Sequence, residues 1–240
     1  MTKSVSEDSL LISTATYNEA DNIDEWINRV RASYPHASVL IVDDDSPDGT
    51  AAIIRKYAER DGRLNLIVRK GKLGIGSAHR VMMVFALENS FSTLVTLDAD
   101  LSHQPEEISL LLAALETHDF VVGTRSGEGF SEYTGLRRFI SVVGNRAAQT
   151  LVPTGLTEYT TSMRAFRREA LEALLAHGVR DEAYAFFMEC VVAMHRCQVR
   201  MTEVPIRFLD RTRGKSKLPR RQVFMSALAL VRLSLDHRLT

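Results

Sequence analysis

The stretch SVLIVDDDSPDGTAAIIRKYAER, residues 38–60, decides the fold. It begins with an apolar run, reaches three aspartates at residues 43–45, turns at SPDGT and continues as a helical segment. A strand followed by a turn and a helix is the building unit of a mostly parallel sheet.

The same order recurs through the first half of the chain. The expected strands are residues 9–18, 38–46, 64–70, 93–100 and 119–125. The expected helices are residues 19–34, 51–60, 77–89 and 105–116. Strands with apolar interiors, separated by single helices, predict an α/β fold in which helices cover both faces of a mostly parallel central sheet.

The second half contains more helix than strand. Its expected helices are residues 139–152, 167–178 and 185–197, with one strand at 199–208 and an amphipathic C-terminal helix at 222–239. No linker or internal repeat separates the halves, so we expect residues 1–240 to form a single domain built on one sheet.

Composition excludes several classes of protein. Hydrophobic residues make up 45% of the 240, and 30 basic residues balance 30 acidic ones, which argues against a general nucleic-acid-binding surface. Neither a signal-peptide pattern nor an apolar run of about 18 residues is present, so we expect no export, no membrane span and a cytoplasmic location. Cys190 and Cys197 suggest core packing rather than a disulfide framework.

Polar groups follow the ends of four predicted strands. They are Thr16, Tyr17, Asn18 and Glu19 after the first, Asp43, Asp44 and Asp45 after the second, Asp98 and Asp100 after the fourth, and Gly123, Thr124 and Arg125 after the fifth. The carboxyl ends of parallel strands meet at one edge of the sheet, where such folds bind ligands. We therefore expect the site at this edge.

Asp98 and Asp100 stand at i and i+2 of the expected strand, so their carboxylates should share one face. Two like charges this close are costly unless a proton or a cation lies between them. The pair is therefore an acid/base pair, a site for Mg²⁺ or Mn²⁺, or a pair of solvated acids at a strand end.

Other features leave alternatives open. His79, His103 and His195 lack the spacing of metal ligands, and we interpret them as packing or surface groups. GKLGIGSA, residues 71–78, is either a glycine-rich phosphate cradle or a tight turn before a helix. The basic run at 211–221 is either a solvated face or a phosphate-binding loop. A metal at the sheet edge with nearby cations would fit a diphosphate leaving group.

Seven motifs, in this order, resemble the dolichol-phosphate mannosyltransferases, which are polyprenyl-phosphate sugar transferases among the family-two inverting glycosyltransferases. They are TYNE (16–19), VDDDSPDGT (42–50), KLGIGSA (72–78), DADLSHQPEE (98–107), GTR (123–125), TTSMRAFRREAL (160–171) and EVPIRFLDRTRGKSK (203–217). The resemblance spans residues 10–235. It implies a GT-A-like, Rossmann-type fold and metal-dependent transfer of mannose from GDP-mannose to dolichyl or polyprenyl phosphate, with inversion.

The resemblance also implies roles for individual residues. The nucleotide pocket would be lined by Ala15, Tyr17, Glu19, Val42, Asp44 and Ala99. The divalent metal, Mg²⁺ or Mn²⁺, would be held by Asp98 and Asp100 with Ser102 nearby. The catalytic set would be Asp100, Arg125, Arg211 and Lys217. In this set Arg125 would face a donor or acceptor phosphate, while Arg211 and Lys217 would close over the diphosphate.

Acceptor binding is implied for Arg137 and Arg138, at the lipid phosphate, and for Ser162 and Arg164, at the sugar. The family tends to write D-x-T-G/S-x-F-R where this chain has Glu158, Thr160, Thr161, Ser162, Met163 and Arg164. The acid is therefore one methylene longer beside the transferred sugar, which bears directly on sugar specificity.

The resemblance divides the chain into a nucleotide-sugar half (10–125), an acceptor and sugar half (126–221) and a C-terminal helix (222–240). This helix would lie in the membrane interface or on a membrane-anchoring partner, or would pack on the core. Glu189 would orient cations of the site or pair with Arg196. The protein would be peripheral at the cytosolic membrane face and would bind no nucleic acid.

Two alternatives for function remain at this stage. A related transferase would use another nucleotide sugar, such as UDP-glucose, or a polysaccharide acceptor. A protein of another class would bind a nucleotide sugar without turning it over.

Overall fold

The structure, a computed structural model, describes residues 5–125, 129–132 and 135–210, together with Leu228, Leu230, Arg232 and Ser234. Side chains are described for all of these residues except 135–141. Within this part of the chain, no helix combines the length and apolar character needed to cross a bilayer.

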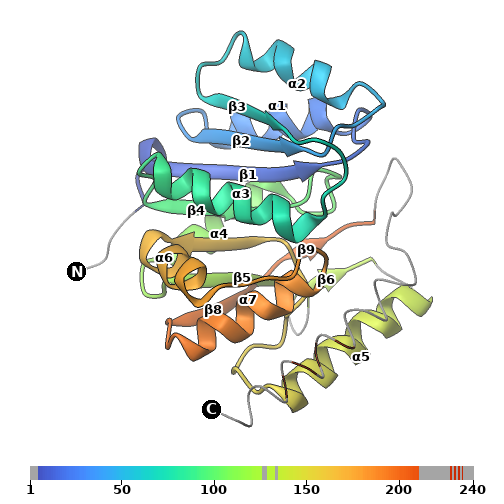
Figure 1. The fold of residues 1–240 in the computed structure, drawn as a ribbon, viewed down its shortest axis with the longest axis vertical. Helices are drawn as coiled ribbons and strands as arrows, with labels where there is room; N and C mark the ends of the chain where they lie inside the picture. The colour runs from blue at the N-terminus through green and yellow to red at the C-terminus, as the bar shows by residue number, and fades with distance from the viewer. Residues whose placement is uncertain are drawn as a thin grey trace.

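A seven-stranded sheet forms the centre of the molecule (Figure 1). Across the sheet the strands are β3 (Leu64–Val68), β2 (Ser38–Asp43), β1 (Leu10–Thr16), β4 (Thr93–Thr96), β7 (Arg164–Arg167), β5 (Phe120–Thr124) and β8 (Met201–Pro205). Neighbouring strands are parallel except at β7, which is antiparallel to both β4 and β5. A second sheet pairs β6 (Phe130–Ser131) with β9 (Arg207–Phe208).

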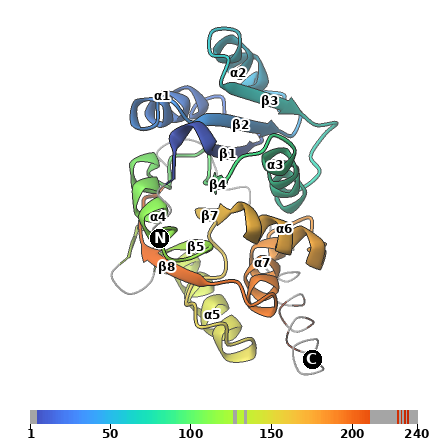
Figure 2. The same cartoon turned by 90° about the vertical axis from the view of Figure 1, so that its left-hand side faces the viewer.

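Helices cover both faces of the large sheet (Figure 2). One face carries α1 (Ile23–Ser33), α2 (Thr50–Ala58) and α4 (Ile108–Ala114), with the short 3₁₀ helices η1 (Glu7–Ser9) and η2 (Pro105–Glu107) beside this layer. The other face carries α3 (Ile75–Glu88), α6 (Arg168–His177) and α7 (Ala185–Arg196). The predicted fold class is therefore confirmed.

Two hydrophobic cores follow from this arrangement. Leu40 belongs to the core under α3 and α7, whereas its neighbour Ile41 belongs to the core under α1. Successive side chains of a strand point to opposite faces, so a strand covered on both sides is apolar throughout. This is why the strands appear in the sequence as continuous apolar runs.

The second half joins the same sheet through β7 and β8, which lie on either side of β5. The helix α5 (Gly135–Leu151) lies beyond β8 and contributes Ala148 to the core shared with α3 and α7. The predicted strand at 199–208 is divided at Ile206 into β8 and β9, which belong to different sheets.

The predicted C-terminal helix is described at four residues, all of them helical. Leu230 and Ser234 are buried, whereas Leu228 and Arg232 are exposed. Residues i and i+4 share a helix face, so at these positions one face packs against the protein while the other meets solvent.

The strand β7 was not predicted. It has four residues, two of them arginines, and its two apolar residues point into different cores. Such a strand shows no alternation of polar and apolar residues, because both of its faces are buried. Its reversed direction is the main difference from the expected sheet.

The glycine-rich stretch before α3 serves a close packing contact. A Cβ atom on Gly76 would lie 2.5 Å from the carbonyl oxygen of Asp181 and 2.7 Å from Cβ of Phe186. The amide of Gly76 donates to the carbonyl of Glu182 at 2.9 Å. This contact supports the tight turn that was weighed against a phosphate cradle.

Glu189 holds the backbone at residues 180–181, next to the segment that Gly76 contacts. Its Oε2 accepts hydrogen bonds from the backbone amides of Arg180 (3.0 Å) and Asp181 (2.8 Å). Among the described residues, the contacts observed for Glu189 are therefore with the backbone rather than with Arg196.

Gly76→Ala should destabilise the protein by about 1–3 kcal/mol, because the added methyl group overlaps the backbone of the 181–182 turn. Urea denaturation compares the free energies of unfolding. Gly62→Ala is the matched control, since no atom lies within 4 Å of a Cβ added there. Equal stability of the two variants would contradict the packing explanation.

Candidate active site

The carboxyl ends of β1, β2, β4 and β5 lie at one edge of the sheet, as predicted from their parallel directions. β7 runs the other way, so this edge is where β7 begins. Residues 157–163, which we call the 157–163 loop, lead into β7 and therefore reach the same edge. The candidate site is thus built from both halves of the chain.

Asp43 and Asp44, at the end of β2, have separate networks. Asp43 is fully buried and accepts hydrogen bonds from the hydroxyls of Thr16 (2.7 Å) and Ser46 (2.6 Å). Asp44 accepts from Arg69 Nε at 2.5 Å and from the amide of Leu73 at 3.2 Å. Asp43 therefore ties β2 to β1, and Asp44 ties β2 to the glycine-rich stretch.

The other residues expected at the nucleotide also lie around this edge. Ala15 is opposite Val42 in the β1–β2 register, and the Val42 side chain lies in the core. Glu19 accepts a hydrogen bond from Asn22 at 2.8 Å. Lys72 lies 4.4 Å from the centre of the Tyr17 ring.

Asp98 and Asp100 lie beyond β4 rather than within it, because β4 ends at Thr96. Their predicted position at the edge holds, but the strand-alternation argument for their pairing was wrong. A turn brings them there, and Leu101 closes it with a left-handed φ of 63°, a conformation that non-glycine residues seldom adopt.

The turn joins Asp100 to Ser102. Asp100 Oδ1 accepts from the amide of Ser102 at 3.0 Å and from its hydroxyl at 2.5 Å. Asp100 is buried, and Ala99 between the two aspartates packs into the core on the α1 face. The Ser102 hydroxyl proton is therefore directed at Asp100.

Asp98 contacts two residues that were assigned elsewhere. Its Oδ1 accepts from the Ser162 hydroxyl at 2.6 Å, and its Oδ2 lies 3.3 Å from Nδ1 of His103. The reading of His103 as a packing or surface group missed this contact. His79 does pack, against the rings of Phe186 and Phe187.

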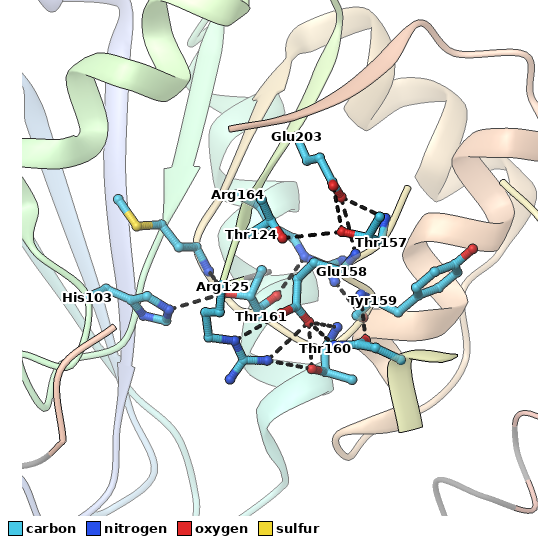
Figure 3. A network of polar contacts seen from close by, with 12 residues as sticks. His103, Thr124, Arg125, Thr157, Glu158, Tyr159, Thr160, Thr161, Arg164 and Glu203 are labelled. Carbon is cyan, nitrogen blue, oxygen red and sulfur yellow. Dashed lines mark hydrogen bonds and ion pairs between the residues drawn. The ribbon is translucent and has the colours of Figure 1, made fainter. Parts of the chain in front are cut away.

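Arg125 and Glu158 form a buried ion pair (Figure 3). Two guanidinium nitrogens of Arg125 donate to the two carboxylate oxygens of Glu158 at 2.9 and 3.0 Å, and one also donates to the hydroxyl of Thr160 at 2.8 Å. Asn145 of α5 adds a hydrogen bond to Glu158 at 3.0 Å. The Arg125 guanidinium also lies 5.1 Å from the centre of the Phe208 ring.

These contacts keep Glu158 ionised. Burial alone raises the pKa of Glu158, but the charge of Arg125 and hydrogen bonds from Arg125 and Thr160 outweigh it and lower the pKa to about 2. The pair therefore holds a cationic side chain in a fixed place beside the site.

Two polar side chains, the half-buried Glu203 and the buried Arg164, fix the backbone of the 157–163 loop. Glu203 of β8 accepts from the amides of Thr157 (2.7 Å) and Glu158 (3.2 Å). Arg164 donates to the carbonyls of Tyr159 (2.9 Å) and Thr161 (2.8 Å). Glu203 on β8 and Arg164 at the start of β7 thereby hold successive parts of the loop.

Arg164 is itself buried between aromatic rings. Its guanidinium lies 5.0 Å from the ring centre of Phe187 and 5.7 Å from that of Phe120. Burial lowers its pKa to about 10, which leaves it protonated at neutral pH. The observed contacts of Arg164 are with carbonyl groups of the loop and with these rings. Its predicted role at the sugar stays a prediction.

Four predicted residues cannot be compared with the geometry. Arg211 and Lys217 lie outside the described residues. Arg137 and Arg138 belong to α5, but their side chains lie outside the described part. Their predicted contacts with phosphate remain predictions.

The residues that sequence reasoning missed are the ones that support the site. His103 stood within the DADLSH motif, and Glu158 stood at the start of a segment recognised for its departure from the family pattern. Glu203 opens the 203–217 motif, but no local pattern indicated its partners, because they lie more than 40 residues away in the chain.

Comparison with known proteins agrees with the sequence and the fold. Residues 12–175 match Glycosyl transferase family 2. The chain belongs to this family. It is therefore a glycosyltransferase, as the motifs indicated.

Two relatives of this glycosyltransferase are similar over most of its length. It is 34% identical over 205 residues to an undecaprenyl-phosphate mannosyltransferase from Micrococcus luteus, which covers 85% of this chain and 84% of the relative. It is 34% identical over 212 residues to a polyprenol monophosphomannose synthase from Mycolicibacterium smegmatis, covering 87% and 80%.

Solved structures share the fold of this glycosyltransferase. Glucosyl-3-phosphoglycerate synthase from Mycobacterium tuberculosis, in complex with phosphoglyceric acid, matches with a TM-score of 0.69 at 17% identity, over 95% of this chain and 79% of that one. A mannosyltransferase from Pyrobaculum calidifontis, in complex with GDP-Man and Mn²⁺, matches with a TM-score of 0.59 at 18% identity, over 98% and 66%.

The carboxylate and hydroxyl oxygens at this edge would fit a divalent cation whose remaining ligands come from the substrate. Among the described residues no group of three or more His, Cys, Asp or Glu side chains could enclose a metal ion. Two carboxylates at a sheet edge suit Mg²⁺ or Mn²⁺ when phosphate oxygens and waters complete the shell. Asp98 and Asp100 are the candidates for such a pair, and the Ser102 hydroxyl is hydrogen-bonded to Asp100.

Glu158→Gln should destabilise the enzyme by about 3 kcal/mol at pH 7, because it leaves the charge of Arg125 buried without its partner. The folded pKa of Glu158 lies below its ordinary value of 4.5, so its contribution is complete above that pH and is lost as the pH falls toward about 2. The difference in unfolding free energy between the two proteins should therefore shrink between pH 5 and pH 3.

Denaturation in urea at several pH values measures this difference. Glu172→Gln is the control, because Glu172 pairs with Arg168 on an exposed helix face and should change stability little at any pH. A Glu158→Gln penalty that does not change with pH would contradict the assignment.

Proposed function

We propose that this glycosyltransferase transfers mannose from GDP-mannose to the phosphate of a polyprenyl phosphate, with inversion and with Mg²⁺ or Mn²⁺. The observation that carries the proposal is the Asp98–Asp100 turn at the carboxyl edge of the sheet, in a chain 34% identical to two relatives named for mannose transfer to polyprenol carriers. The GDP-Man and Mn²⁺ complex of a protein with the same fold supports the choice of donor and metal.

The donor would lie along the ends of β1, β2 and β4. In this proposal, Ala15, Tyr17, Glu19, Val42, Asp44 and Ala99 form the nucleotide pocket. The hydrogen bonds from Arg69 and Leu73 to Asp44 support it, because they hold the pocket wall before any ligand arrives. Asp98 and Asp100, with Ser102, would hold the cation, which when bound neutralises charge on the diphosphate.

The acceptor phosphate needs no general base from the protein. A phosphate monoester is largely dianionic near neutral pH, because its second pKa is about 6. The chain's own task is then to align the acceptor oxygen with the anomeric carbon and to stabilise the leaving diphosphate. Arg125, held in one place by Glu158, suits a phosphate contact of this kind.

The remaining predicted residues complete the proposal. Arg211 and Lys217 would cover the diphosphate, Arg137 and Arg138 would bind the lipid phosphate, and Ser162 and Arg164 would shape the sugar site. Residues 1–240 would act as one glycosyltransferase domain, with 10–125 taking the nucleotide sugar and 126–221 the acceptor.

Asp98→Asn and Asp100→Asn should each lower kcat/KM at least 100-fold, since each removes a charge that the diphosphate and its cation require. The assay follows radiolabelled mannose from GDP-mannose into an organic phase containing polyprenyl phosphate, with UDP-glucose as the competing donor. Asp119→Asn is the control, because Asp119 pairs with Arg200 beside the amino end of β5, at the opposite edge.

Transfer from UDP-glucose alone, or onto a polysaccharide, would overturn the choice of substrates. Binding of GDP-mannose without turnover of any donor would favour a non-catalytic protein. Full activity of Asp98→Asn would overturn the proposed site.

The proposal includes peripheral contact with the cytosolic membrane face, directly or through an anchoring partner, because the acceptor is a lipid. Val142 and Val143 on α5 are 41% and 46% exposed, and Leu228 of the C-terminal helix is 49% exposed. Neighbouring exposed valines on a helix otherwise rich in polar residues suit the membrane interface.

Val142→Glu combined with Val143→Glu should lower sedimentation with anionic liposomes several-fold, because a carboxylate does not partition into the interface. Donor binding should be unchanged, since both side chains point to solvent. Leu110→Glu on α4 is the matched control, as Leu110 is 43% exposed on a different helix. Equal loss of sedimentation in both proteins would contradict a membrane contact through α5.

A further inference from the structure

Asp98 is held at several atoms by residues outside its own turn. Its Oδ1 accepts from the Ser162 hydroxyl at 2.6 Å, and its Oδ2 lies 3.3 Å from His103 Nδ1. Its backbone carbonyl accepts from the indole nitrogen of Trp26 at 3.0 Å. The Asp98 side chain nevertheless remains 31% exposed. These contacts therefore orient the carboxylate and leave part of it accessible.

His103 cannot turn freely. Its side chain is 1% exposed, and its Nε2 lies 3.1 Å from the Thr161 hydroxyl. The edge of its ring meets Phe208 at a centroid distance of 4.9 Å, and an isolated β-bridge links the two backbones. Nδ1, at the opposite side of the ring, accepts a hydrogen bond from the backbone amide of Asp98 at 3.3 Å and lies equally close to its carboxylate, so His103 is held against Asp98 at both groups.

Ser162 is also fixed. Its carbonyl accepts from the hydroxyl of Thr96, the last residue of β4, at 2.7 Å. Thr161 and Ser162 are neighbours in the 157–163 loop, so both contacts with Asp98 depend on the same loop. The buried Arg164 and the half-buried Glu203 hold that loop in place.

We propose that His103 and Ser162 are positioning residues that set the orientation in which the Asp98 carboxylate meets the divalent cation. This inference rests on the proposed function, because it requires the cation at Asp98. Groups that hydrogen-bond to a metal ligand fix its direction, and their loss typically lowers metal affinity about 10- to 100-fold. In this proposal Ser162 acts on the Asp98 carboxylate, a role different from its predicted contact with the sugar.

A purely structural role makes a different prediction. If His103 matters only as a packed ring against Phe208, phenylalanine should replace it well and asparagine poorly. If His103 matters for the group that it directs at Asp98, the order reverses, because asparagine keeps a polar atom near the position of Nδ1.

The experiment measures Mn²⁺ affinity by titration calorimetry in the presence of saturating GDP. We expect His103→Phe and Ser162→Ala to weaken Mn²⁺ binding about 10-fold or more, and His103→Asn to weaken it less than about threefold. GDP binding in EDTA and the thermal midpoint report on the fold. Ser109→Ala is the control for Ser162→Ala, because Ser109 is exposed and its hydroxyl donates to the backbone carbonyl of Glu106 in η2, outside the candidate site.

Asp98→Asn separates this inference from the proposed function. If Asp98→Asn leaves Mn²⁺ affinity unchanged, the proposed cation site is wrong and the inference fails with it. If Asp98→Asn weakens binding while Ser162→Ala and His103→Phe do not, the positioning inference alone is overturned. A His103→Phe protein that binds Mn²⁺ better than His103→Asn would show that only packing matters.

Discussion

The reversed direction of β7 is the constraint on which the rest of the site depends. A parallel strand between β4 and β5 would deliver its own carboxyl end to the active edge. An antiparallel strand delivers its beginning instead, and with it the 157–163 loop. That loop touches Asp98 through Ser162 and Arg125 through Glu158, so one segment joins the end of β4 to the end of β5.

Burying charge so close to a reactive site is costly unless every charge has a partner. At the 157–163 loop, neighbouring groups stabilise both buried charges, although Nη1 of Arg164 has no hydrogen-bond partner among the described residues. Glu158 pairs with Arg125, and Arg164 combines backbone carbonyls with two aromatic faces. Groups held in this way need little reorganisation when a charged substrate arrives, which is the condition for electrostatic stabilisation of a leaving group.

The sequence predicted most of the sheet because β1, β2 and β4 are buried on both faces and the first four strands are each followed by a helix. It predicted that Asp44, Asp98, Asp100 and Arg125 lie at one edge of the sheet, because each stands near the carboxyl end of a strand. It failed for β7, because two of the four residues of this buried strand are arginines and the segment does not resemble a strand. It also failed for His103, because the contact of His103 with Asp98 depends on a turn rather than on strand alternation.

Local order along the chain was therefore determined by the sequence itself: alternating strands and helices, polar residues at strand ends, and the motifs of a family 2 glycosyltransferase. Tertiary structure alone decided which polar residues became partners. Ser162 and Asp98 are 64 residues apart, and Arg125 and Glu158 are 33 apart. The periodicity of apolar residues shows only which face of a segment is buried. These contacts follow instead from the direction of β7 in the sheet, and that direction depends on the packing of the whole chain.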